Sequence, residues 1–118
     1  MKVRYTAGRI STEFEGDQVD IFGQLAEFQE IFEETNCGKC DSESIRYVVR
    51  NVEDNSYHEL HCKDCRAKLA FGQHKKQTKK TLFPKRRAGK NHATGLDEGT
   101  YLPDRGWLRW DGQAKKAV

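Results

Sequence analysis

The sequence predicts a small α+β protein, because one stretch has the periodicity of a helix and others have the composition of strands. Between positions 18 and 35, apolar residues recur at helical spacing and carboxylates lie mostly on the opposite face. Residues 45–52 and 57–61 are rich in β-formers and flank a turn-forming Glu-Asp-Asn-Ser sequence. Two Cys-x-x-Cys pairs frame this second region. The chain has few large apolar residues, and a small core needs an additional stabilising element or a partner.

The first residues, 2–15, alternate between apolar and polar side chains, which predicts extended chain. The phase of the alternation changes at Gly8, so the segment is either one strand with a β-bulge or two strands joined by a tight turn. Asp17 and Asp20 then supply an N-cap signature for the helix over about 18–35. Its apolar stripe consists of Ile21, Phe22, Leu25, Phe28, Ile31 and Phe32.

We expect one small domain, whose remaining parts follow from turn signals and from the loss of apolar residues. A hairpin is predicted over 44–61, and a third strand starts at Ala67. The last residues are expected to fray. The predicted parts are 1–36 (strand and acidic helix), 37–74 (three-stranded cysteine region), 75–95 (basic flexible loop) and 96–118 (Trp-containing segment with a short turn).

The composition predicts a soluble protein with few large apolar side chains to bury. Leu, Ile, Val and Phe account for 23 of the 118 residues, whereas 33% of the residues are charged. No apolar run approaches the roughly 18 residues of a membrane span, and the first residues lack the apolar stretch of a secretory signal. We therefore expect a cytoplasmic location and no membrane partner, while the oligomeric state stays open.

The net charge of +3 combines two blocks of opposite sign, each of which favours an oppositely charged partner. Eight carboxylates and no Lys or Arg lie between Ile10 and Gly38. Ten cations and no carboxylate lie between Cys65 and Leu96: Arg66, Lys68, Lys75, Lys76, Lys79, Lys80, Lys85, Arg86, Arg87 and Lys90.

All four cysteines fall in two motifs, Cys37-Gly-Lys-Cys40 and Cys62-Lys-Asp-Cys65, separated by 21 residues. This spacing is close to that of four-thiolate zinc sites, in which each short turn directs two sulfurs at one tetrahedral cation. We predict that these four residues bind one structural Zn²⁺ ion, and four-thiolate iron stays an alternative. Disulfides are disfavoured without a secretory signal. The nearby His58 and His61 are expected on the strand surface or around the ligands.

Residues 37 to about 74 resemble the zinc ribbon, a small fold in which two cysteine turns clamp a three-stranded sheet. Ribbons of this kind occur in transcription, replication and translation machinery, so the resemblance implies a role with nucleic acid. Ribbon turns often carry glycine after the second cysteine, whereas Asp41 and Arg66 stand there in this chain.

The chain as a whole also resembles small accessory proteins that tailed bacteriophages encode among their DNA-metabolism genes. The resemblance rests on the strand-helix-ribbon order and on the stretches 82–86 (LFPKR) and 102–107 (LPDRGW). It implies an accessory role in phage or bacterial DNA replication or recombination, in the host cytoplasm if the chain is phage-encoded.

The basic block, with aromatic residues nearby, predicts a nucleic-acid-binding protein. Single strands are favoured over duplex, because unpaired bases can stack on aromatic side chains and no helix here is basic enough for a major groove. DNA is the expected strand, although RNA fits the same pattern. The predicted contacts are Lys75, Lys76, Lys79, Lys80, Phe83, Lys85, Arg86, Arg87, Trp107 and Trp110.

Two other functions remain open. The hairpin resembles that of transcript-cleavage factors that act on RNA polymerase, in which an acidic pair follows an arginine at the tip, and Arg50, Glu53 and Asp54 stand in comparable places. The acidic region 13–34 could instead inhibit a protein by imitating nucleic acid. A replication, recombination or transcription protein is the expected partner of the acidic helix. No nucleophile motif or phosphate loop is present, so we do not expect an enzyme.

Overall fold

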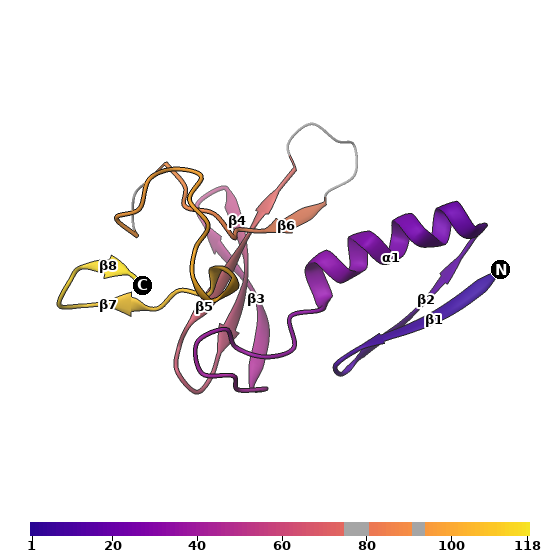
Figure 1. Ribbon diagram of the computed structural model, residues 1–118, viewed down its shortest axis with the longest axis horizontal. Helices are drawn as coiled ribbons and strands as arrows, with labels where there is room; N and C mark the ends of the chain where they lie inside the picture. Colours follow the sequence, from indigo (N-terminus) through magenta and orange to yellow (C-terminus); the bar gives the residue numbers. More distant parts are fainter. Residues whose placement is uncertain (75–80, 91–93) are drawn as a thin grey trace. The chain divides into compact units, whose positions relative to one another are not determined.

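The computed structural model describes residues 1–74, 81–90 and 94–118. It divides the chain into two compact units, Met1–Thr35 and Asn36–Val118. We therefore describe each unit by itself. Each unit combines antiparallel strands with short connections, and the first unit adds the α-helix (Figure 1), so the predicted α+β class is confirmed.

The first unit is a β-hairpin followed by a helix. Strands β1 (Lys2–Ala7) and β2 (Ile10–Glu15) pair along their whole length through a two-residue turn. Gly8 opens this turn with a φ of +56°, so the change of phase in the sequence marks a tight turn and not a bulge. Helix α1 (Gln18–Phe32) starts at the predicted Asp17 cap, where Asp17 and Asp20 form a reciprocal capping box.

The apolar face of α1 covers the hairpin through a cluster of aromatic rings. Phe28 makes edge-to-face contacts with Tyr5 and Phe14, each with ring centroids 5.7 Å apart, and lies 4.9 Å from Phe32. Phe22, which the sequence placed in the same stripe, is instead 78% exposed. The cause is its position one residue after the buried Ile21, on the outer side of the helix.

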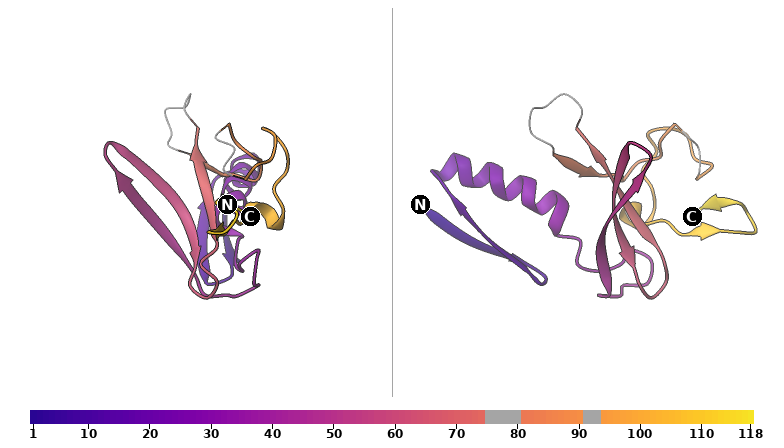
Figure 2. Two further views of the ribbon diagram at one scale, coloured as in Figure 1. Left: turned by 90° about the vertical axis from the view of Figure 1, so that its left-hand side faces the viewer. Right: turned by 180° about the vertical axis from the view of Figure 1, so that it is seen from behind.

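The second unit contains a four-stranded antiparallel sheet in the order β3-β4-β5-β6. Strands β3 (Ile45–Val52) and β4 (Asn55–Cys62) form the predicted hairpin, and β5 (Lys68–Gln73) pairs with the second half of β4. The other half of the hairpin extends beyond β5 as a two-stranded arm (Figure 2).

The fourth strand, β6 (Leu82–Pro84), corrects the prediction of a three-stranded sheet followed by a flexible loop over 75–95. It pairs with the end of β5, and the ring of Phe83 lies over Gly72, where an added Cβ would come within 2.4 Å of it. A three-residue strand is too short to show periodicity in the sequence. It is extended because it pairs with β5. Residues 75–80 and 91–93 of the predicted loop lie outside the described residues.

The C-terminal segment folds back on the sheet. It contains the 3₁₀ turn η1 (Asp104–Gly106) and a small hairpin of β7 (Trp110–Asp111) and β8 (Lys116–Ala117), so the chain end is paired where fraying was expected. Trp107, just after η1, is fully buried together with Leu60 and Leu69 and forms the core of this unit. Among the described residues, no helix is long and apolar enough to cross a membrane.

Candidate functional site

Both cysteine motifs adopt the same backbone turn. The Asp41 amide donates to the Cys37 carbonyl at 2.9 Å, and the Arg66 amide donates to the Cys62 carbonyl at 3.1 Å. Asp41 and Arg66 have φ values of 63° and 65°, which lie in the left-handed region that usually favours glycine. The two turns therefore keep one geometry although neither has the glycine that ribbon turns often carry at this position.

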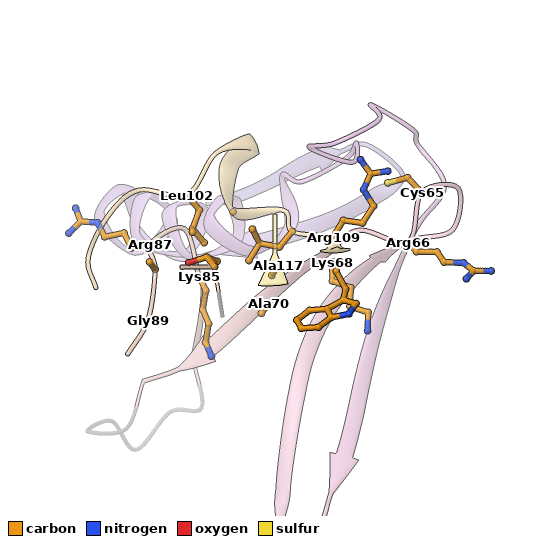
Figure 3. A pocket seen from close by; sticks show the side chains of 15 residues that line it. Cys65, Arg66, Lys68, Ala70, Lys85, Arg87, Gly89, Leu102, Arg109 and Ala117 are labelled. Carbon is orange, nitrogen blue, oxygen red and sulfur yellow. The ribbon is translucent and has the colours of Figure 1, made fainter. Parts of the chain in front are cut away.

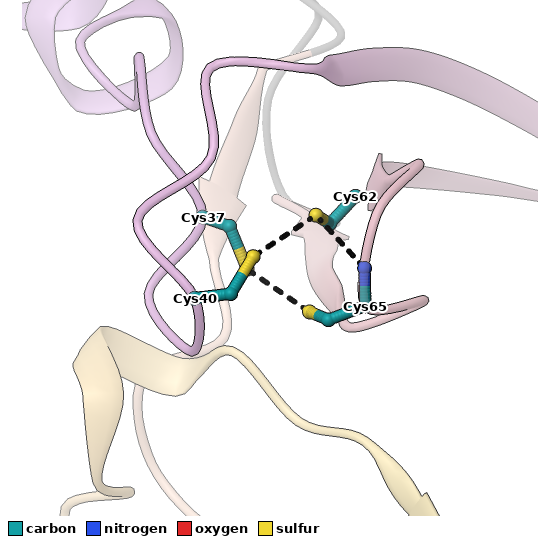
Figure 4. A group of neighbouring side chains, drawn as sticks. All are labelled: Cys37, Cys40, Cys62 and Cys65. Carbon is teal, nitrogen blue, oxygen red and sulfur yellow. Dashed lines mark hydrogen bonds between the residues drawn. The ribbon is translucent and has the colours of Figure 1, made fainter.

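The four sulfurs of Cys37, Cys40, Cys62 and Cys65 lie within 4.8 Å of one another (Figure 4). The sulfurs of Cys37 and Cys65 are 3.5 Å apart, and those of Cys40 and Cys62 are 3.6 Å apart. Ligands at about 2.3 Å from a tetrahedral ion lie about 3.8 Å from each other, so the cluster fits one metal ion. It is the one cluster of this kind among the described residues, and neither His58 nor His61 belongs to it.

The sulfurs of the cluster differ in how readily they lose a proton. Burial tends to raise the pKa of Cys62, but backbone amides of Cys65 and Asp64 and two neighbouring thiols outweigh it and lower the pKa to about 7. At Cys40 the Ser42 amide favours the thiolate, yet burial and the three other sulfurs raise the pKa to about 12. A negative charge on one sulfur thus disfavours ionisation of its neighbours, and a bound divalent cation would offset this repulsion.

Residues outside the cysteine region 37–74 support the first cysteine turn. The Lys39 ammonium pairs with the Asp104 carboxylate at 2.6 Å, and the Arg105 guanidinium donates to the Asn36 carbonyl at 3.2 Å. The Ser42 hydroxyl donates to the Asp64 carboxylate and joins the two turns. His61 lies instead beside Glu59 at 2.9 Å, on the strand surface. The C-terminal segment therefore supports the first cysteine turn from outside the cysteine region.

The predicted nucleic-acid contacts separate into four groups. Lys75, Lys76, Lys79 and Lys80 lie outside the described residues. Trp107 is fully buried, which corrects its assignment as a stacking residue, because the indole fills the core between the sheet and the first cysteine turn. Phe83 is half-buried over Gly72, and Arg86 donates to the Arg105 carbonyl at 2.6 Å. Lys85, Arg87 and Trp110 are exposed.

Those three exposed residues line one pocket of the second unit, with a volume of about 750 Å³ (Figure 3). Arg66, Lys68 and Arg109 line it too, and no carboxylate does. These three cations are not among the contacts predicted from the sequence, although Arg66 and Lys68 belong to the basic block. They meet the others because backbone bonds between Lys68 and Leu108 place the C-terminal segment beside β5.

The residues of the polymerase-type prediction, Arg50, Glu53 and Asp54, lie at or near the tip of the β3–β4 hairpin. Glu53 and Asp54 form the two-residue turn between β3 and β4, and Glu53 has a φ of 55°. The Arg50 guanidinium donates to Glu59 at 3.2 Å and lies 4.9 Å from the centre of the Tyr57 ring. Arg50 thus contacts two side chains of the neighbouring strand β4 and stabilises the hairpin. These contacts do not bring it to Glu53 and Asp54 at the tip.

Neither a protein-family model, nor a curated protein, nor a solved structure matches the chain. The geometry of the described residues supports a site for one metal ion at the four cysteines and, beside it, an open pocket lined by cations.

Proposed function

We propose that this chain is a zinc-binding protein that binds single-stranded DNA and serves as an accessory factor in DNA replication or recombination. Zinc is proposed over iron because it needs no redox partner and is the usual ion of four-cysteine structural sites. With four sulfurs on one ion no coordination position stays open, so the metal stabilises the fold and does not catalyse.

The observation that supports DNA binding is the set of five cations around one pocket, without a carboxylate and beside an exposed tryptophan. Such a surface attracts a polyanion, and an exposed indole offers unpaired bases a stacking partner. A duplex is less suitable, because α1, the α-helix of the described residues, carries carboxylates and no Lys or Arg. The phosphates on either side of a major groove repel a helix whose charged side chains are all carboxylates.

Two measurements test the proposal. Elemental analysis of the purified protein should give one zinc ion per chain, and stoichiometric iron would contradict the choice of metal. Fluorescence anisotropy of labelled single-stranded and duplex DNA of one sequence should show preference for the single strand and a steep loss of affinity with salt. Absence of binding to either form at low salt would refute the DNA proposal.

A further inference from the structure

The pocket of the second unit has a floor that differs from its rim. Its inner walls include the small or apolar side chains of Ala70, Ala88, Leu102, Leu108 and Ala117. Its volume of about 750 Å³ lies in the range of about 300–1,000 Å³ that is usual for pockets that take small molecules. A bare phosphate needs no apolar floor, and an apolar ligand needs no ring of cations, so the pocket fits a ligand that has both a flat apolar part and an anionic part.

We propose that this pocket holds one nucleotide of the bound strand, with its base turned in against the apolar walls and Trp110. This inference rests on the proposed function and specifies how the strand is held. Lys68, Lys85 and Arg109 contact the phosphates on either side of that nucleotide. The rest of the strand follows the basic surface without base-specific contacts.

The three cations at the rim are available for phosphates. All three side chains are exposed, and within 1–74, 81–90 and 94–118 none of them pairs with a carboxylate. In Figure 3 the ammonium groups of Lys85 and Lys68 extend to opposite sides of Ala70, and the Arg109 guanidinium lies above both. A base seated between them would have one neighbouring phosphate on each side.

Three further features position the walls of the pocket. The Arg87 guanidinium lies 4.3 Å from the centre of the Tyr101 ring and also bonds to its hydroxyl, so this cation is fixed at the rim. Trp110 is 65% exposed and is anchored by the pairing of β7 with β8. Cys65 and Arg66 belong to the second cysteine turn and also line the pocket, so the metal site forms one of its walls.

The test compares two strands of equal length and charge, titrated into the zinc-loaded full chain. One strand is oligothymidine, and the other has the same phosphodiester backbone with abasic sugars. The readouts are affinity at two salt concentrations and the tryptophan emission. Trp110 is exposed and should be quenched by a stacked base, whereas the fully buried Trp107 gives a constant background.

Two variants and matched controls assign the contacts. Trp110→Leu should weaken oligothymidine binding about tenfold and leave the abasic strand unaffected. The triple variant K68Q/K85Q/R109Q should lower the salt slope by about 2 for both strands. Tyr57→Leu removes an exposed aromatic ring outside the pocket, and K2Q/R46Q/K63Q removes the same charge from exposed sites elsewhere; both should bind like the unchanged chain.

The outcomes separate this inference from the proposed function. Stronger binding of oligothymidine than of the abasic strand, with quenching of tryptophan emission that Trp110→Leu abolishes, supports a base in the pocket. Equal binding of both strands, or equal losses in the pocket and control variants, overturns the pocket while DNA binding stands. Binding of thymidine monophosphate as tight as that of the strand overturns the assignment to a strand. Absence of binding by any ligand overturns both proposals.

Discussion

Trp107 lies against Gly38 so closely that a Cβ atom on Gly38 would come within 2.6 Å of the indole ring. The same added atom would lie 2.3 Å from the Asp104 carbonyl oxygen. Gly38 belongs to the first cysteine turn and Trp107 to the C-terminal segment, so this contact joins the metal site to the core of the second unit. The absence of a side chain at Gly38 is what permits it.

Gly38→Ala should therefore destabilise the second unit by about 1–3 kcal/mol, because the new methyl group overlaps a backbone oxygen and a buried ring. Both tryptophans lie in this unit, so the thermal midpoint of their fluorescence reports its unfolding. Gly112→Ala is the matched control, since a Cβ there meets nothing within 4 Å. An unchanged midpoint for Gly38→Ala would show that the turn and the indole do not pack as described.

The two tryptophans should differ sharply when each is truncated. Trp107 is fully buried, so Trp107→Ala should cost about 3–5 kcal/mol through lost burial and the cavity that remains. Trp110 is 65% exposed, so Trp110→Ala should change stability by about 0.5 kcal/mol or less. Chemical denaturation of both variants measures the difference. Similar losses for both would contradict the assignment of Trp107 to the core.

Glu59 predicts a dependence of stability on acid pH. Burial tends to raise its pKa, but hydrogen bonds from Arg50 and His61 outweigh burial and lower the pKa below the ordinary 4.5. Its carboxylate thus stabilises the folded state fully above pH 4.5, and this contribution is lost as pH falls through the lowered pKa. Denaturation at a series of pH values should show a steeper acid loss for the unchanged chain than for Glu59→Gln.

The control for Glu59 is Glu43→Gln, which removes an exposed carboxylate from the same unit. Its stability should fall with acid as steeply as that of the unchanged chain. If Glu59→Gln also follows that curve, the contacts with Arg50 and His61 contribute nothing measurable to the pH dependence.

Removal of the metal should disrupt the second unit, because the four sulfurs otherwise bring mutually unfavourable charges together beside a small core. A chelator should shift the emission of Trp107 toward that of an exposed indole and abolish the cooperative transition of this unit. Cys40→Ser should lose the metal, whereas Ser44→Ala, an exposed change next to the site, should retain it. Emission and melting that do not respond to the chelator would refute a structural metal.

Local spacing allowed several features to be predicted from the sequence. The capping pair at Asp17 and Asp20 gave the start of α1 correctly, because a cap acts on the next turn of chain. Its end was predicted at about 35 but lies at Phe32, since residues 33–36 contain no glycine or proline that would mark a stop. The missed strand β6 is short and pairs only through β5, so its own residues carry too little information.

By itself, the sequence determined the α+β class, the capped helix, the long hairpin and the four cysteines that can hold a metal ion, because each follows from residue types and their spacing along one stretch of chain. Only the tertiary structure decided that Trp107 is core while Trp110 is exposed, and that Arg66, Lys68 and Arg109 join Lys85 and Arg87 around one pocket. Those placements depend on which distant segment folds back onto β5. The backbone hydrogen bonds between Lys68 and Leu108 hold the C-terminal segment there, and the spacing of residues along the chain does not predict these bonds.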